Sequence, residues 1–199
     1  MKKLISLLLA LVMVAALFAG CGNNAADNNE NNENVENNEQ TPDVVVPGSA
    51  LEVLENIWAL YGDDEKFPTM GGDMNNLVDN APGVYSLEDV ETLGVQLLVP
   101  ADQVGNISEA ASLFHGMMLN NFTCGVFRVS DGAAFAETMH GAVGSAQWMC
   151  GMPEKELIAI IGGEYVLMAF GINDAIEPFE AKLLEAYPDA QIVYSQAIG

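Results

Sequence analysis

The chain has 199 residues and is strongly acidic, with 28 Asp and Glu against 6 Lys and Arg and a formal net charge of −22. Proteins that bind nucleic acids need clustered Lys and Arg to neutralise phosphates, so this composition excludes a nucleic-acid partner. The same charge favours cationic partners, although an acidic surface also serves solubility alone.

The first 20 residues have the three parts of a secretory signal peptide. Lys2 and Lys3 are basic, residues 4–18 are apolar, and Ala19 and Gly20 are small residues that precede a cysteine. The apolar run of about 15 residues is shorter than the ~20 residues that a membrane-spanning helix needs. We therefore expect residues 1–20 to be removed.

Residues 17–21, LFAGC, resemble the lipobox of bacterial lipoproteins, although Phe18 occupies the position where Leu is usual. The resemblance implies that Cys21 receives a diacylglyceryl group and becomes the mature N-terminus. Two or more acyl chains anchor a protein stably, and each buried methylene contributes about 0.8 kcal/mol. We predict an extracytoplasmic protein held at the bacterial cell membrane by lipid on Cys21.

Residues 21–48 are rich in Asn and Glu, and residues 22–40 contain only Ala25, Ala26 and Val35 as apolar side chains. Such a segment buries too little surface to offset its ordering entropy, and its like charges extend it. We predict a disordered tether over residues 21–48 and one folded domain over residues 49–199. Without Lys2 and Lys3, the mature chain keeps four of the six basic residues, and −22 becomes −24.

The first half of the domain is predicted to contain few regular elements. Ser49 and Glu52 form a capping-box pattern before an apolar stripe, which predicts a helix over residues 50–61. Residues 62–83 are rich in Gly, Pro, Asp and Asn and predict a long loop. The run VQLLV, residues 95–99, predicts a strand, and the spacing of apolar residues in 107–114 predicts a short helix.

The second half is more regular. Apolar runs predict strands over residues 122–130, 156–161, 164–170 and 190–195, and the Gly162-Gly163 pair predicts a tight hairpin. Helices are predicted after Asp131 and around residues 176–187. The order βαββαβ indicates an α+β fold with a ferredoxin-like core over about 122–195, an N-terminal helix and an extra strand. Strands 122–130 and 164–170 are predicted to be central and parallel.

Three segments, HGMMLNNFTCGVFRVSD, QWMCGMP and IGGEYVLMAFG, together with the lipobox and tether, are similar to small lipoproteins of anaerobic Firmicutes. Some members of this group carry the label bacteriocin transport accessory protein, and others contain domains of unknown function. The label implies a thioredoxin-like chemistry. This chain has no Cys-x-x-Cys, so the usual dithiol mechanism is not expected.

Cys124 and Cys150 are the two cysteines left after Cys21, and we consider them a possible thiol pair. The predicted sheet separates their strands, which favours two free, buried thiols over a disulfide. Several methionines and histidines resemble Cu(I) ligands in type, but no copper-chaperone motif is present. We expect no metal, no cofactor and no catalytic residue.

The sequence therefore predicts a lipid-anchored binding or accessory domain that is not an enzyme, with the membrane and a cationic peptide or envelope protein as its partners. Two alternatives remain open. One is a thiol or transport accessory protein for bacteriocin-like peptides, and the other is a structural envelope protein.

Overall fold

The computed structural model describes residues 46–149 and 151–199. The predicted signal peptide, the lipidation site Cys21, most of the predicted tether and Cys150 lie outside the described residues. No helix in the described ranges has the length and apolar character needed to cross a membrane.

Four α-helices, two short 3-10 helices and eight strands make up the described chain. The helices are α1 Ala50–Trp58, α2 Val90–Leu97, η1 Ala101–Asn106, η2 Leu119–Asn121, α3 Gly132–Ser145 and α4 Asn173–Ala186. The strands are β1 Thr69–Gly71, β2 Val78–Asp79, β3 Gly83–Val84, β4 Ile107–His115, β5 Phe122–Val129, β6 Lys155–Ile161, β7 Tyr165–Gly171 and β8 Gln191–Ala197.

The eight strands form one sheet in the order β2-β1-β4-β5-β7-β6-β8, with β3 pairing to β4. Each pair of neighbours is antiparallel. The predicted α+β class is confirmed, and the succession β5-α3-β6-β7-α4-β8 is the predicted βαββαβ order.

One detail of the predicted topology was wrong. Strands β5 and β7 are neighbours near the middle of the sheet, but they are antiparallel, with Phe122 opposite Gly171 and Arg128 opposite Tyr165. A hairpin joins β6 to β7 and reverses the chain, whereas the α3 crossover keeps β5 and β6 parallel. Because β7 lies between β5 and β6, it must run opposite to both. The last strand, β8, pairs with β6.

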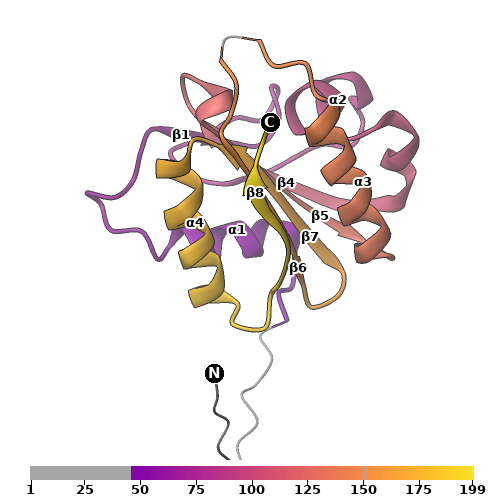
Figure 1. Cartoon of the computed structure of the whole chain (residues 1–199). Helices are drawn as coiled ribbons and strands as arrows, with labels where there is room; N and C mark the ends of the chain where they lie inside the picture. Colours follow the sequence, from indigo (N-terminus) through magenta and orange to yellow (C-terminus); the bar gives the residue numbers. More distant parts are fainter. Residues whose placement is uncertain (1–45, 150) are drawn as a thin grey trace, which may run out of the picture. The chain divides into compact units, whose positions relative to one another are not determined.

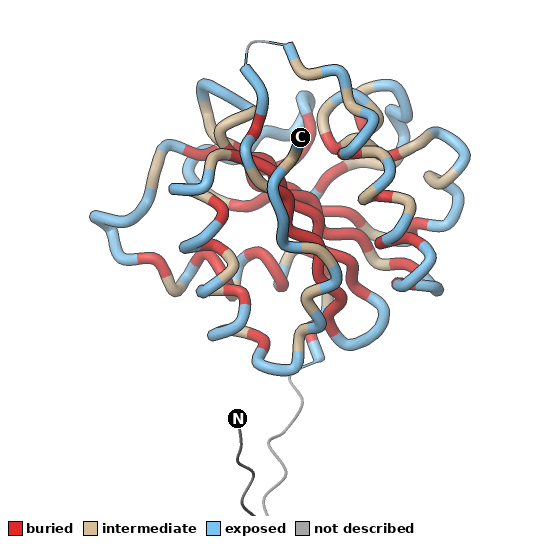
Figure 2. Tube along the Cα trace, viewed as in Figure 1, coloured by how far each residue is buried: buried red, intermediate tan, exposed pale blue. Residues whose placement is uncertain are grey.

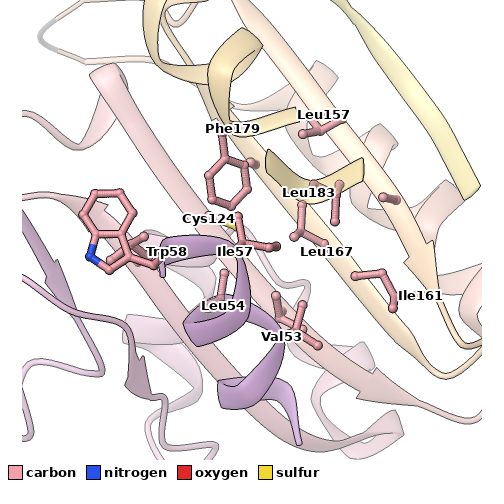
Figure 3. Close-up of a cluster of buried hydrophobic side chains, with 14 of the residues drawn as sticks. Val53, Leu54, Ile57, Trp58, Cys124, Leu157, Ile161, Leu167, Phe179 and Leu183 are labelled. Carbon is pink, nitrogen blue, oxygen red and sulfur yellow. The ribbon is translucent and has the colours of Figure 1, made fainter. Parts of the chain in front are cut away.

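Helices cover both faces of the sheet (Figure 1). On one face, α1 and α4 pack on a core that includes Leu54, Ile57, Phe179 and Leu183 (Figure 3). On the other face, α2 and α3 pack on a second core that includes Phe135. The central strands are accordingly buried along their length (Figure 2).

The opposite placement of α3 and α4 follows from the handedness of crossover connections. The β5-α3-β6 and β7-α4-β8 units both move two places toward the β8 edge of the sheet. Strand β7 runs opposite to β5. If both crossovers are right-handed, as almost all are, their helices must lie on opposite faces.

Two predictions for the first half were wrong. Residues 95–99 do not form a strand, because α2 extends through Leu97 and buries Leu93 and Leu97 at helical spacing. Residues 107–114 do not form a helix, because they belong to β4. Strand β4 lies between β5 and the β1 and β3 strands, and its side chains are buried in the cores of both faces, Leu113 in one and Ala110 in the other.

Three predicted signals at element ends are confirmed, those of Ser49, Asp131 and the Gly162-Gly163 pair. Ser49 caps α1 by accepting from the Glu52 N–H, and Asp131 caps α3 by accepting from the Ala134 N–H. Gly162 and Gly163 have φ values of 59° and 79° in the turn between β6 and β7. This left-handed region suits glycine, which has no Cβ to clash there.

Gly71 lies so close to another part of the backbone that no larger side chain fits there. A Cβ added at Gly71 would lie 2.2 Å from the backbone nitrogen of Gly83. Gly71→Ala should therefore lower the free energy of unfolding by about 1–3 kcal/mol, the usual range for overpacking. Gly141 is the matched control, because it lies in α3 with nothing within 4 Å of an added Cβ. Gly141→Ala should raise stability by about 0.5–1 kcal/mol. Urea unfolding followed by circular dichroism checks both signs, and equal effects would refute the packing argument.

Candidate functional site

Two connections meet at one end of the sheet. Strand β5 begins where β4 ends, and β6 begins at the same end because it runs parallel to β5. The β4–β5 connection carries η2, and the connection from α3 to β6 begins at Ala146. These two connections provide the most exposed large apolar side chains of the described residues at this end of the sheet.

The exposed apolar side chains surround a hollow of about 330 Å³. Its lining residues, which we call the methionine surface, are Met117, Met118, Leu119, Asn120 and Met149. Met117 is 79% exposed and Met149 is 81% exposed. Exposed methionines scattered singly need no explanation, but a cluster around a hollow is typical of an interaction site.

The methionine surface is held by specific contacts. The Nδ1 atom of His115 accepts the N–H groups of Met117 and Met118 at 3.2 and 3.3 Å. The Asn120 amide donates to the carbonyl oxygens of Met149 and Gly151 at 2.8 and 2.5 Å, which joins the two connections. The backbone beneath the methionines is therefore fixed, while their unbranched side chains remain adaptable.

The chain as a whole is negatively charged. None of the five residues of the methionine surface is charged. All four basic side chains in the described ranges already lie against a carboxylate or an aromatic ring. These contacts are Arg128 with Glu109 and Glu164, Lys155 with Glu180, Lys182 with Glu65 and Glu185, and Lys66 over the Trp58 ring. The acidic side chains therefore dominate the long-range field.

Asp73 has a structural role in the loop after β1. Its Oδ1 atom accepts the N–H groups of Asn75 and Asn76, and its Oδ2 atom accepts the N–H of Ser86. Burial by itself raises the pKa of Asp73, but these hydrogen bonds outweigh burial and hold the pKa below its usual value. Asp73 also lines an acidic hollow of about 370 Å³, together with Glu88. Because three backbone donors occupy its oxygens, we assign Asp73 to the loop structure.

The structure places Cys124 away from any accessible surface. Cys124 lies on β5 and is fully buried beneath α1 and α4, near Ile57, with no disulfide partner among the described residues (Figure 3). Burial raises the pKa of its thiol well above the usual value. A buried thiol of raised pKa is chemically inert. Whether Cys124 and Cys150 pair stays a prediction, since Cys150 lies outside the described residues.

The residues considered as soft-metal ligands are only partly brought together, because Met117, Met118 and Met149 line one hollow while Met139 and Cys124 lie elsewhere. Met139 is buried in the core under α3, and Cys124 is buried in the core on the other face of the sheet. Within residues 46–149 and 151–199, no group of three or more His, Cys, Asp and Glu side chains could hold a metal ion. Asn120 gave no signal in the sequence that it would join the two connections.

Comparisons of the chain with protein-family models, curated proteins and solved structures gave no match. The similarity to small Firmicutes lipoproteins therefore stays a prediction.

The burial of Cys124 predicts its reactivity. Iodoacetamide should leave Cys124 unmodified in the native protein and alkylate it fully once urea unfolds the chain, because only the exposed thiolate reacts. Mass spectrometry of the peptide that contains Cys124 measures both states. Rapid alkylation under native conditions would show that the β5 core opens or that the thiol is accessible.

Proposed function

We propose that this chain is a lipid-anchored extracytoplasmic binding protein whose folded domain binds amphipathic cationic peptides on the methionine surface. The lipobox and the acidic segment after Cys21 support the anchored location. The predicted similarity to lipoproteins linked with bacteriocin transport points to the same class of partner.

The observation that carries the proposal is the exposure of Met117 and Met149 around a hollow whose backbone is held in place. Methionine is flexible and polarisable, so it adapts to apolar side chains of different shapes. A rigid backbone beneath flexible side chains suits a site that accepts several related peptides.

The acidity of the chain favours peptides with a positive net charge. The mature chain is strongly acidic, and its described basic groups are all engaged. Long-range attraction therefore accelerates the association of cationic partners. An amphipathic peptide can place its apolar face on the methionines while its basic residues face the acidic surroundings.

The anchored location predicts lipidation at Cys21. Cells fed a clickable palmitate should label the wild-type protein, and Cys21→Ala should take up no label because the thiol that accepts the diacylglyceryl group is gone. The variant should accumulate as precursor or leave the membrane fraction. Labelling of Cys21→Ala would contradict the anchor, whatever the folded domain binds.

The proposed site predicts that Met117 and Met149 contribute to the affinity for the peptide. The double variant Met117→Gln/Met149→Gln should weaken the binding of a basic amphipathic peptide about tenfold or more, because an amide replaces the adaptable apolar contact. Met74→Gln is the matched control, since Met74 is also exposed, at 60%, but lies outside the methionine surface. Fluorescence anisotropy at low and physiological ionic strength measures both variants.

Two further controls separate shape from charge. A scrambled peptide of the same composition keeps the charge and loses the apolar face, and a chain without residues 22–45 loses much of the acidic segment. Surface attraction alone is screened over about 8 Å at physiological salt. If binding disappears at that salt, or if Met74→Gln weakens it equally, the specific site is refuted and acidity serves solubility.

A further inference from the structure

Another hollow lies on the α3 face of the sheet beside β8. Its volume is about 190 Å³, and its lining includes Trp148, Met152 and Gln196 together with Glu156 and His140. It shares no lining residue with the methionine surface. The size suits a small chemical group better than a drug-sized ligand, which needs at least about 300 Å³.

Glu156 is the unusual residue of this hollow. It is 2% exposed and begins an otherwise apolar stretch of β6. Its Oε1 atom lies 2.8 Å from Nδ1 of His140, whereas its Oε2 atom has no hydrogen-bond partner among the described residues. Burial raises the pKa of Glu156, and the neighbouring His140 and Gln196 oppose that shift. A buried carboxylate with an unsatisfied oxygen is costly unless a donor or a positive charge compensates it.

The imidazole of His140 is held in one orientation. Its ring stacks on Tyr194 of β8 with centroids 3.9 Å apart and planes 10° apart. The Tyr194 hydroxyl donates to Glu137, one turn earlier on α3. The titratable groups around Glu156 are thus His140, Tyr194 and, beyond Tyr194, Glu137. Lys155, the adjacent residue on β6, forms a hydrogen-bonded ion pair with Glu180 and does not line the hollow.

We propose that this hollow binds a primary ammonium group, with Glu156 as its anionic partner. An ammonium supplies both the missing hydrogen-bond donor and the compensating positive charge. The indole of Trp148 lines the hollow, and the face of an aromatic ring attracts cations. An anion would instead face the carboxylate of Glu156. The site is independent of the methionine surface, and the ammonium belongs either to a free alkylamine or to a lysine side chain.

The two tryptophans of the chain provide an internal reference for the test. Trp148 lines the hollow, whereas Trp58 lies on α1 in the core of the opposite face and donates its indole N–H to the Asn80 carbonyl. Titration of the ¹⁵N-labelled full chain in detergent with n-butylamine should shift the Trp148 indole resonance saturably and leave that of Trp58 unchanged. 1-Butanol has the same alkyl chain without the charge and should give no saturable shift.

A pair of glutamate variants tests the assigned partner. Glu156→Gln keeps the shape but removes the charge, so it should weaken butylamine binding at least tenfold. Glu177→Gln removes an exposed charge from α4 and should leave binding within twofold of wild type. The comparison of butylamine with butanol uses the wild-type protein alone, so it decides the proposal even if Glu156→Gln does not fold.

Protons compete with the ligand. Burial raises the pKa of Glu156, so protons compete with the ligand for its carboxylate as the pH falls, whereas an alkylamine, like a lysine side chain of ordinary pKa ~10.4, stays charged. Binding should therefore weaken as the pH falls, and Glu156→Gln should remove most of this dependence. A short peptide with one lysine, compared with its acetyl-lysine form, distinguishes a peptide source from a free amine. No saturable Trp148 shift, equal shifts with butanol, or equal losses in the two glutamate variants would overturn the proposal.

Discussion

The rest of the structure depends on the need to cover both faces of β5 and β7. Seven of the eight residues of β5 and all seven residues of β7 are buried. A strand of this kind cannot lie at the surface of a two-layer fold with one solvated face. The chain therefore needs helices on both sides, and it supplies α1 and α4 to one face and α2 and α3 to the other. The reversal between β5 and β7 lets two crossovers of the same hand provide that cover.

This arrangement leaves little polar chemistry in the middle of the sheet. Its side chains are needed for packing, which is why Cys124 is a core residue and not a reactive thiol. The accessible polar and flexible side chains of the two candidate sites therefore lie at one end of the sheet and beside its β8 edge. The methionine surface occupies one end of the sheet, and Glu156 lies beside the edge strand β8, whose residues are mostly exposed. Both hollows use residues from the connection between α3 and β6, Met149 for one and Trp148 for the other.

The sequence predicted the second half of the domain well because its signals are local and redundant. Uninterrupted apolar runs gave β5, β6 and β7, Asp131 gave the start of α3, and Gly162-Gly163 gave the turn. The first half was misread because two patterns mimic the wrong element. In β4, burial on both faces and an irregularity between Ile107 and Glu109 remove the two-residue alternation. At the end of α2, the run VQLLV, residues 95–99, resembles a strand, and the cap by Asp89 was not recognised.

The two candidate sites were less predictable, since each depends on contacts between distant residues. Asn120 and Met149 are 29 positions apart, and Glu156 meets His140 from a different element. The one available signal for Glu156 was a carboxylate at the start of an apolar strand, which is usually read as a strand boundary.

If a cationic peptide binds the methionine surface as proposed, charge and shape contribute in different ways. The acidic field acts over a distance and is not specific, so it raises the rate of encounter for any cationic molecule. Dispersion contacts with the methionines act only at contact and depend on the fit of apolar groups. Because the hollow itself is uncharged, a bound peptide need not desolvate an ion there, and its residence time depends on how many apolar side chains it can place. Discrimination among cationic peptides should consequently appear in dissociation rates and hardly at all in association rates.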